Sequence, residues 1–231
     1  MSLNSSHPVA RTRIKICGFL EQQHVDAAVN AGADALGFVL YPHSVRAIPL
    51  ELCAELTRHV PAFVSTVALF VNPTRQDVET ALSAARIDLL QFHGIEPEAF
   101  CASFGRPYLK ALAVDESFDL LKCQKQYASA SALLLDTPSA GHGGSGKTFN
   151  WQLINTPNTR ETQGAHAPAL VLSGGLIAAN VADAIKAVRP FAVDVSSGVE
   201  ISRGVKSSEL IQQFCRAVRD ADARIFDADF R

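Results

Sequence analysis

Apolar and polar positions divide the chain into two kinds of segment that follow one another repeatedly. Short runs that alternate or are almost continuously apolar are typical of strands, and the near-continuous form is typical of a sheet covered on both faces. These runs occupy residues 13–17, 34–40, 64–71, 89–93, 107–112, 131–136, 170–173 and 191–195. Each is followed by a segment with the start or stop signals of a helix, such as Pro49 or Gly32.

These segments predict eight strand-then-helix units with no break in composition between them. The expected helices cover 21–30, a segment from 49, 74–85, 96–104, 117–127 (capped by Asp115 or Ser117), a short piece around Trp151, 176–188 and a segment from 207. Parallel strands need crossover helices. We therefore predict an α/β protein with one (β/α)8 barrel domain, the TIM barrel, over residues 13–231, after a flexible lead-in at 1–12. A doubly wound open sheet is the alternative.

Composition narrows the class of protein. Of the 231 residues, 48% are apolar, which is enough for a large core, yet no apolar run approaches the roughly 20 residues needed to cross a bilayer. A net charge of −2 argues against a nucleic-acid binder held by bulk charge. The five cysteines form no CxxC pair, which favours reduced thiols in a cytoplasmic protein. The expected partner is a small molecule, with no nucleic acid and no membrane.

Polar residues gather where the predicted strands end. The carboxyl ends of the strands carry Cys17, Asn72, His93, Asp136, Gly174–Gly175 and Ser196–Ser197–Gly198, whereas the opposite ends carry mostly helix caps and Pro or Gly stops. Active sites of barrel enzymes are built from the loops after the strands. The asymmetry therefore predicts an enzyme.

Two of these strand ends predict a phosphate site. The pair Gly174–Gly175 follows the seventh strand, and Ser196, Ser197 and Gly198 follow the eighth. Backbone N–H groups near a helix start can hold a phosphate dianion, and barrels commonly bind phosphate at this position. Ordinary tight turns are the alternative, but the double match favours a phosphate ester as substrate.

Cys17 and Asp136 are the candidates for acid–base chemistry. A thiol at a strand end, near helix starts and glycine N–H groups, can ionise near neutral pH and take a proton. Asp136 follows an apolar run on the sixth strand, where partial desolvation would let it keep a proton and donate it. The alternatives are a small core residue for Cys17 and a helix cap for Asp136.

Three further residues are candidates for binding substrate. Arg46 lies in the loop after the second strand and could face a carboxylate. His93 more often lines such a pocket than transfers a proton. Asp194 lies within the apolar eighth strand, so it is either a member of a buried network or a hydrogen-bond partner of substrate.

Residues 141–148, GHGGSGKT, fit the phosphate-loop pattern of nucleoside triphosphatases. That loop needs its first glycine at a strand end and a substantial helix after the threonine. Here residues 137–140 intervene, and only a short helix and two further strands follow. A glycine-rich lid over the mouth, with Lys147 near a bound anion, is the preferred interpretation.

The motifs together resemble the phosphoribosylanthranilate isomerase family of tryptophan biosynthesis. The matching pieces are KICG at 15–18, ADALGFVLYPHSVR at 33–46, LFVNPT at 69–74, QFHG at 91–94, LLLDT at 133–137, GGSGKTFNW at 143–151, LSGGL at 172–176 and VDVSSGVE at 193–200. The resemblance implies a barrel without metal or cofactor. It also implies an intramolecular oxidoreductase (aldose–ketose isomerase) that carries out the Amadori rearrangement of N-(5-phosphoribosyl)anthranilate.

The resemblance also implies a role for each matching residue. Cys17 would be the general base at C2 of the opened sugar, Asp136 the general acid at the furanose ring oxygen, and Arg46 the clamp on the anthranilate carboxylate. Gly174, Gly175, Ser197 and Gly198 would hold the phosphate. Val45 stands where the family commonly has proline, so the pose of Arg46 is less fixed by the backbone.

Two other classes stay open. A sister barrel lyase or synthase, such as indole-glycerol-phosphate synthase, would need a lysine and a glutamate at strand ends, for which Lys15 and Lys110 are the strand lysines. A phosphate-binding protein without activity is the second. The expected assembly is a monomer or a homodimer.

Overall fold

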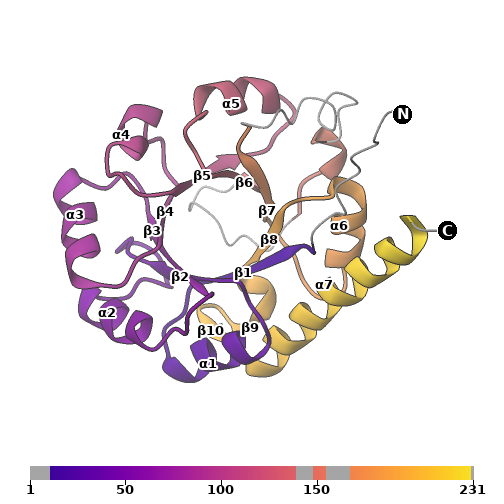
Figure 1. Cartoon of the computed structure of the whole chain (residues 1–231), viewed down its shortest axis with the longest axis horizontal. Coiled ribbons are helices and arrows are strands. Elements are labelled where there is room, and N and C mark those ends of the chain that lie inside the picture. The colour runs from indigo at the N-terminus through magenta and orange to yellow at the C-terminus, as the bar shows by residue number, and fades with distance from the viewer. Residues whose placement is uncertain (1–10, 139–147, 155–166, 230–231) are drawn as a thin grey trace, which may run out of the picture.

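The computed structural model describes residues 11–138, 148–154 and 167–229. Its centre is a closed barrel in which eight parallel strands follow one another in chain order (Figure 1). The strands are β1 Arg13–Cys17, β2 Ala35–Val39, β3 Ser65–Phe70, β4 Leu89–Phe92, β5 Tyr108–Ala113, β6 Ala132–Asp136, β7 Ala169–Leu172 and β8 Ala192–Val195. β8 pairs with β1 and closes the ring. The predicted (β/α)8 barrel is confirmed.

Helices surround the barrel on the outside (Figure 1). They are α1 Gln22–Asn30, α2 Leu50–Arg58, α3 Arg75–Ala84, α4 Glu98–Ala102, α5 Leu120–Gln126, α6 Val181–Val188 and α7 Ser208–Asp229. The first five follow β1 to β5, and the last two follow β7 and β8. Between β6 and β7 the described residues hold a 3-10 helix, η1 Trp151–Leu153, where a short helix was predicted.

Side chains of each strand alternate between two cores. On β1, Ile14 and Ile16 belong to the large cluster between the barrel and its helices. A second cluster fills the barrel interior with residues such as Val67, Leu134 and Val171. Because alternate residues share a face, Lys15 and Cys17 point into the ring.

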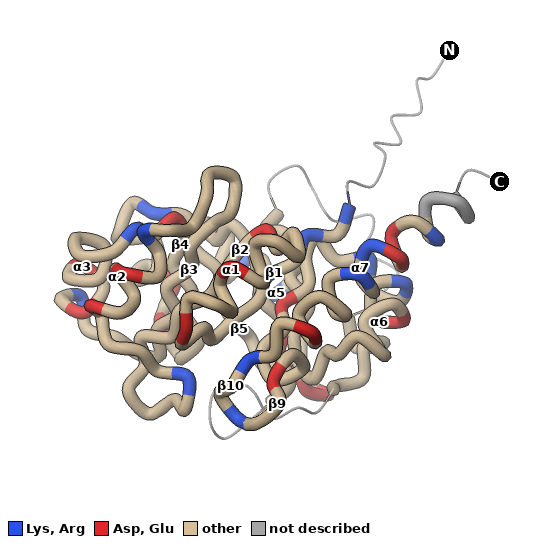
Figure 2. The backbone as a smooth tube through the Cα atoms, turned by 90° about the horizontal axis from the view of Figure 1, so that it is seen from below, with Lys and Arg blue, Asp and Glu red and all other residues tan. Residues whose placement is uncertain are grey.

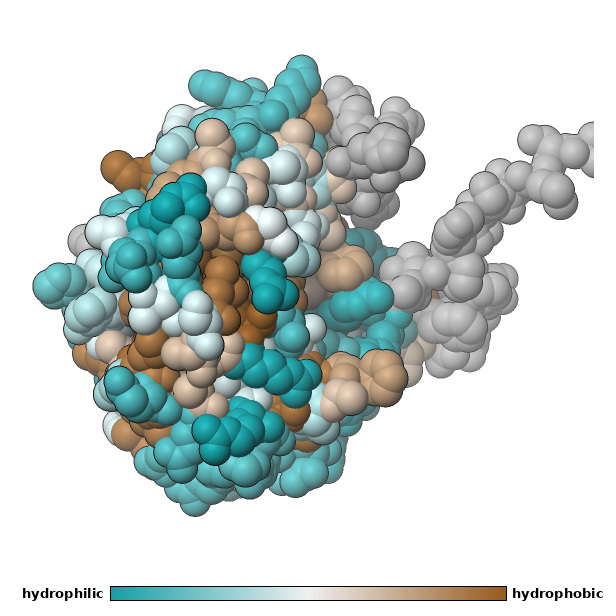
Figure 3. Space-filling model, turned by 60° about the vertical axis from the view of Figure 1, so that its left-hand side comes forward, coloured by the Kyte–Doolittle hydropathy of each residue, from teal (hydrophilic) through white to brown (hydrophobic). Residues whose placement is uncertain are grey.

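On the face shown in Figure 3, apolar side chains form a patch bordered by polar ones.

The N-cap predicted for α5 is wrong. The helix begins at Leu120, and its cap is Asp119, whose side chain accepts a hydrogen bond from the backbone N–H of Lys122. Asp115 instead accepts hydrogen bonds from the N–H and hydroxyl of Ser117 and so caps a turn. An aspartate side chain accepts a hydrogen bond from a backbone N–H both in turns and at helix starts, so the sequence alone does not separate the two.

A short hairpin after β8 was not predicted. β9 Glu200–Ser202 and β10 Val205–Lys206 pair antiparallel and follow the 3-10 turn η2 Ser197–Val199. Gly204 turns the chain between them with φ of +88°. Figure 2 shows the hairpin at one end of the barrel.

The predicted lead-in, 1–12, lies outside the described residues except for its last two members. Thr12 donates hydrogen bonds from its N–H (2.8 Å) and hydroxyl (2.7 Å) to the carboxylate of Asp222 on α7. In the part of the chain that the structure describes, no helix has the length and apolar character needed to span a membrane.

Candidate active site

The carboxyl ends of the strands enclose two cavities that share lining residues. The larger, of about 130 Å³, is lined by Cys17, Arg46, Gln91, His93, Asp194 and Ser196, among others. The smaller shares Asp194 and Ser196 and adds Asp136, Gly174, Gly175 and Ser197. All but one of the candidate residues therefore line these two cavities. Gly198 lines neither, because it packs directly against Leu176.

Another cavity, of about 680 Å³, lies outside the strand ring. It is lined by residues of the loop after β2, the end of β3 and helix α3, such as Pro42, Val71 and Thr80. None of the residues predicted for acid–base chemistry or phosphate binding lines it. We place the site at the barrel mouth because that is where the polar groups converge.

Cys17 ends β1 and is 4% exposed. A Cβ on Gly37 of the neighbouring strand would lie 2.6 Å from the Cys17 sulfur, so the glycine makes room for the thiol. Burial raises the pKa of Cys17 above its ordinary value, and the nearby Lys15 ammonium opposes the rise. Burial therefore opposes the ionisation near neutral pH that the sequence predicted, whereas the surrounding cations favour it.

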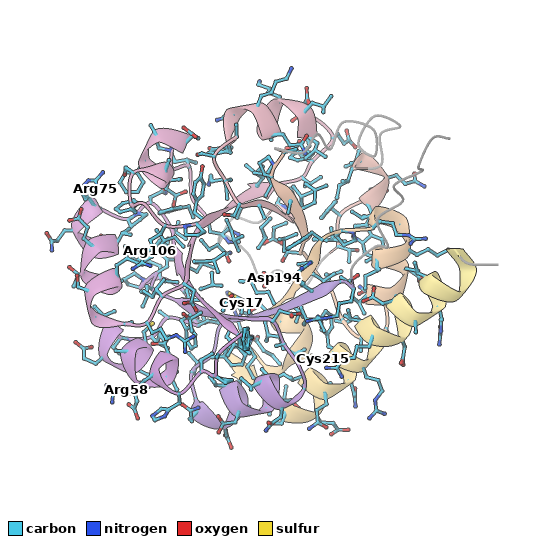
Figure 4. All side chains as sticks on the ribbon, viewed as in Figure 1. Cys17, Arg58, Arg75, Arg106, Asp194 and Cys215 are labelled. Carbon is cyan, nitrogen blue, oxygen red and sulfur yellow. The ribbon has the colours of Figure 1, made fainter. Side chains whose placement is uncertain are left out.

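Asp194 belongs to a buried network. Lys15 donates a hydrogen bond from Nζ to its Oδ1 at 2.7 Å, and the Ser173 hydroxyl lies 3.4 Å from Oδ2. The two strands that carry Lys15 and Asp194 are paired in register at these residues. Figure 4 shows Cys17 and Asp194 inside the strand ring, whereas Cys215 lies out on α7. Of the two roles left open for Asp194, the structure shows the network.

Arg46 is held by a glutamate that the sequence analysis did not single out. Its Nε and Nη2 donate to the two carboxylate oxygens of Glu200 at 2.7 and 2.8 Å. Glu200 also accepts from Lys206 Nζ at 2.8 Å. Burial alone would raise the pKa of Glu200, but Arg46 and Lys206 outweigh it and lower that pKa to about 2. The two hydrogen bonds to Glu200, together with Gly18 packed against the aliphatic part of Arg46, fix the position of this side chain. They do so although Val45 stands in place of the proline expected before it.

Asp136 and His93 contact each other across the mouth. His93 Nε2 lies 3.4 Å from Asp136 Oδ2, and the N–H of Thr137 donates to Oδ1 at 2.8 Å. On the other side of the imidazole, Gln91 Nε2 lies 3.1 Å from His93 Nδ1. An amide NH₂ only donates, so with this amide orientation Nδ1 accepts and Nε2 carries the proton that faces Asp136. His93 thus links the larger cavity to the carboxyl group of the smaller one.

The glycine pair after β7 has the backbone expected of an anion cradle. Gly174 and Gly175 have φ of +86° and +61°, values that side-chain-bearing residues rarely adopt. A Cβ on Gly198 would lie 1.9 Å from the carbonyl oxygen of Leu176, so the loops after β7 and β8 meet here. The Ser196 hydroxyl donates to the carbonyl oxygen of Cys17 at 2.9 Å, which ties the same loop to the end of β1.

The two lysines of the alternative lyase or synthase are both engaged in buried ion pairs. Lys15 binds Asp194, as described above. Lys110 Nζ lies 3.0 Å from Glu96 Oε2 and donates to the carbonyl oxygen of Gly94, and it lines neither mouth cavity.

Within the described residues no group of three or more His, Cys, Asp or Glu side chains is placed to hold a metal ion. The glycine-rich loop and Lys147 lie outside the described residues apart from Thr148.

Comparison with known proteins identifies the family. A family profile described as "N-(5'phosphoribosyl)anthranilate (PRA) isomerase" matches residues 14–217. The chain belongs to this family. An N-(5'-phosphoribosyl)anthranilate isomerase of Leptothrix cholodnii is 52% identical over 95% of the chain and 96% of that relative. One of Methylibium petroleiphilum is 50% identical over 93% of the chain and 97% of that relative.

Solved structures of the family have the same fold. The phosphoribosylanthranilate isomerase of Thermotoga maritima superposes with a TM-score of 0.81 at 38% identity, covering 90% of the chain and 99% of that structure. Another isomerase structure, in complex with reduced 1-(o-carboxyphenylamino)-1-deoxyribulose 5-phosphate, gives a TM-score of 0.78 at 36% identity with the same coverage. The family, the barrel and the link to tryptophan biosynthesis expected from the sequence motifs are confirmed.

Proposed function

We propose that the chain is an aldose–ketose isomerase that converts N-(5'-phosphoribosyl)anthranilate to the corresponding 1-deoxyribulose 5-phosphate. The observation that carries this proposal is the arrangement at the mouth. A buried thiol, a carboxyl group backed by histidine, a forked arginine and a glycine-lined cradle all lie at the carboxyl ends of the strands. They match the four parts of such a substrate: C2, the ring oxygen, the carboxylate and the phosphate.

Asp136 starts the reaction. It donates a proton to the furanose ring oxygen while the anilino nitrogen lone pair forms the C1=N bond and the C1–O bond breaks. The iminium that results makes the hydrogen on C2 acidic. His93 Nε2–H and the Thr137 N–H both face the carboxyl group and hold it in place at the mouth.

Cys17 completes the reaction. Its thiolate takes the proton from C2, the C2–H electrons form C1=C2, and the C1=N π electrons return to nitrogen. The enolamine then becomes the ketone by losing its O–H proton and gaining a proton at C1. Cys17 lines the larger cavity and Asp136 the smaller one, so the two groups serve different ends of one sugar.

Arg46 is proposed to bind the anthranilate carboxylate. Glu200 occupies Nε and Nη2, which leaves Nη1 for substrate. Gly174 and Gly175, with Ser197 and Gly198 of the loop after β8, are proposed to hold the phosphate through backbone N–H groups.

The test is the fluorescence decay of the anthranilate substrate with the Cys17→Ser variant. We expect kcat to fall by several orders of magnitude, because a serine alkoxide is far harder to form than a thiolate. Cys123→Ser on α5, a thiol away from the mouth, should keep normal turnover. Near-normal turnover of Cys17→Ser would remove the base role, and inactivity of the parent protein on this substrate would remove the function.

The setting of the enzyme is also proposed. We propose a cytoplasmic protein that works as a monomer or a homodimer and binds neither nucleic acid nor membrane, in keeping with its net charge of −2. One solved relative consists of monomers generated from the dimeric phosphoribosylanthranilate isomerase of Thermotoga maritima. Light scattering of the purified chain decides between the two assemblies.

A further inference from the structure

The buried pair of Lys15 and Asp194 has none of the roles assigned above, yet it lies beside the proposed base. Nζ and Oδ1 are 2.7 Å apart, and the two side chains are 4% and 6% exposed. Lys15 and Cys17 are two residues apart on β1, so their side chains point to the same side, into the ring. Figure 4 shows Cys17 and Asp194 together inside the ring.

Stability of the fold does not account for this pair. Removing two charges from water costs several kcal/mol per ion, roughly, and well-packed apolar residues often serve as well or better. Much of the barrel interior is filled in that apolar way, by residues such as Val67, Leu134 and Val171. A charged pair in the layer directly below Cys17 therefore points to a role in the chemistry of the thiol.

The positive charges around Cys17 favour its thiolate form. The positive charges of Lys15 and Lys206 both favour the thiolate and lower the pKa of Cys17, and Lys15 has the larger effect. Asp194 opposes the thiolate but acts more weakly on it than Lys15 does. Burial works against the Lys15 ammonium, yet Asp194 and Cys17 outweigh it and raise the pKa of Lys15. The titratable or charged side chains that face Cys17 or line its cavity are Lys15, Asp194, Lys206, Arg46, Arg203, Tyr41, His43 and His93.

Two of the other nearby cations, Arg46 and Lys206, are shared with another anion. Glu200 accepts hydrogen bonds from both Arg46 and Lys206, so much of their charge is compensated away from the thiol. Lys15 is compensated by Asp194 at Oδ1 and still interacts with the sulfur. It is the cation best placed to stabilise a negative charge on Cys17.

We propose that Lys15, kept charged by Asp194, is a positioning residue that stabilises the thiolate form of Cys17. The inference rests on the proposed function, in which that thiolate is the base at C2. Lys15 transfers no proton: the ammonium stays bound to Asp194 while Cys17 passes from thiolate to thiol and back. The pair thus offsets the desolvation of a base that must be buried to exclude water.

The test measures the thiol itself rather than turnover. Thiolates react with iodoacetamide and thiols do not, so the rate of alkylation of the Cys17 peptide, followed by mass spectrometry against pH, gives its ionisation. In the charge-neutral variant Lys15→Met/Asp194→Asn we expect alkylation near neutral pH to slow by about tenfold, equivalent to a pKa about one unit higher. An unchanged or faster alkylation profile would overturn the proposal.

Two further variants guard against a folding defect. Lys15→Gln/Asp194→Asn removes the same charges but keeps two side chains that can hydrogen-bond to each other, and it should slow alkylation equally. Glu96→Gln/Lys110→Met removes a comparable buried ion pair that does not line the Cys17 cavity, and it should leave the alkylation profile of Cys17 unchanged. A shift of similar size in this control would mean that loosening of the barrel, and not Lys15, changes the thiol.

The result is separable from the proposed function. Cys17→Ser turnover tests whether Cys17 is the base, and alkylation of Cys17 tests whether Lys15 stabilises its thiolate. If Cys17→Ser stays active while the Lys15 variants slow alkylation, the base role of Cys17 fails and the electrostatic inference stands. If Cys17→Ser is inactive and the Lys15 variants alkylate normally, the inference alone is wrong.

Discussion

Gly174 lies where any side chain would collide with Thr137 and press against the proposed acid, Asp136. Its φ is +86°, and a Cβ there would lie 2.4 Å from Thr137 Oγ1 and 3.1 Å from Asp136 Oδ1. The sequence indicated this glycine as part of a phosphate site. In the structure it also makes room for Asp136, so a single position serves both the proposed phosphate site and the proposed acid.

Gly174→Ala should therefore cost activity beyond its cost in stability. Placing an L-residue at such a φ costs about 1–2 kcal/mol, and a shift of Asp136 of about 1 Å can lower kcat roughly 100-fold. Gly105→Ala is the matched control, because Gly105 has φ of +61° but no atom within 4 Å of its would-be Cβ. Both variants should lose thermal stability through the positive φ, and only Gly174→Ala should lose turnover. Equal activities would show that Asp136 tolerates displacement.

The site residues differ in how far sequence could predict them. Cys17, Asp136 and His93 were predictable because each directly follows an apolar strand run, and strand ends of a barrel meet at one rim. The ion pairs that hold the site together were not predictable. Asp194 is 179 residues from Lys15, and Glu200 is 154 from Arg46, so each pairing depends on closure of the ring. No local spacing carries that information.

At the scale of elements, the hairpin β9–β10 acts as a brace for the second loop. Glu200 on β9 binds Arg46, accepts a hydrogen bond from the N–H of Gly204 in the turn, and binds Lys206 on β10. The Lys206 ammonium also donates to the carbonyl oxygen of Ser196 at 2.9 Å. One carboxylate thus joins the loop after β2 to the loop after β8.

Glu200→Gln should loosen this brace and raise KM roughly tenfold with a smaller effect on kcat, because hydrogen bonds to a charged partner contribute about 1.5–3 kcal/mol. Steady-state kinetics with the anthranilate substrate measure both constants. Glu209→Gln, the same change at an exposed site on α7, should alter neither. A lower KM in Glu200→Gln would mean instead that Glu200 competes with substrate for Arg46.

The elements themselves were largely predictable, and the exceptions have physical reasons. Strand runs in a barrel are buried on both faces and so stand out as apolar. β9 and β10 have only three and two residues, which is too few to show the alternation of apolar and polar positions that predicts a strand. α4 covers only Glu98–Ala102 within the predicted 96–104 because Pro97 is its N-cap and Glu96 is drawn into the pair with Lys110.

At the scale of the whole molecule, Glu200 should make stability depend on pH. Its pKa in the folded protein is about 2, below the ordinary 4.5, so the carboxylate is stabilised by folding. The contribution is present above about pH 4.5 and is lost as pH falls towards 2. A shift of this size corresponds to roughly 3 kcal/mol.

Urea unfolding at a series of acidic pH values measures this contribution. The free energy of unfolding of the parent protein should fall more steeply across this range than that of Glu200→Gln, while Glu209→Gln should follow the parent. If the parent and Glu200→Gln gave parallel curves, the buried fork with Arg46 and Lys206 would contribute no linkage to folding.

The central claim is that a thiol and a carboxyl group at one barrel mouth act on opposite ends of a sugar whose phosphate is held by the loops after β7 and β8. A crystal structure with the reduced product analogue bound tests it most directly. We predict the Cys17 sulfur within about 3.5 Å of C2, in near-attack geometry. We also predict the Asp136 carboxyl group beside the oxygen at C4, the carboxylate on Arg46 and the phosphate on Gly174–Gly175. An analogue bound with C2 turned away from Cys17, or with its phosphate far from the glycine pair, would contradict the account.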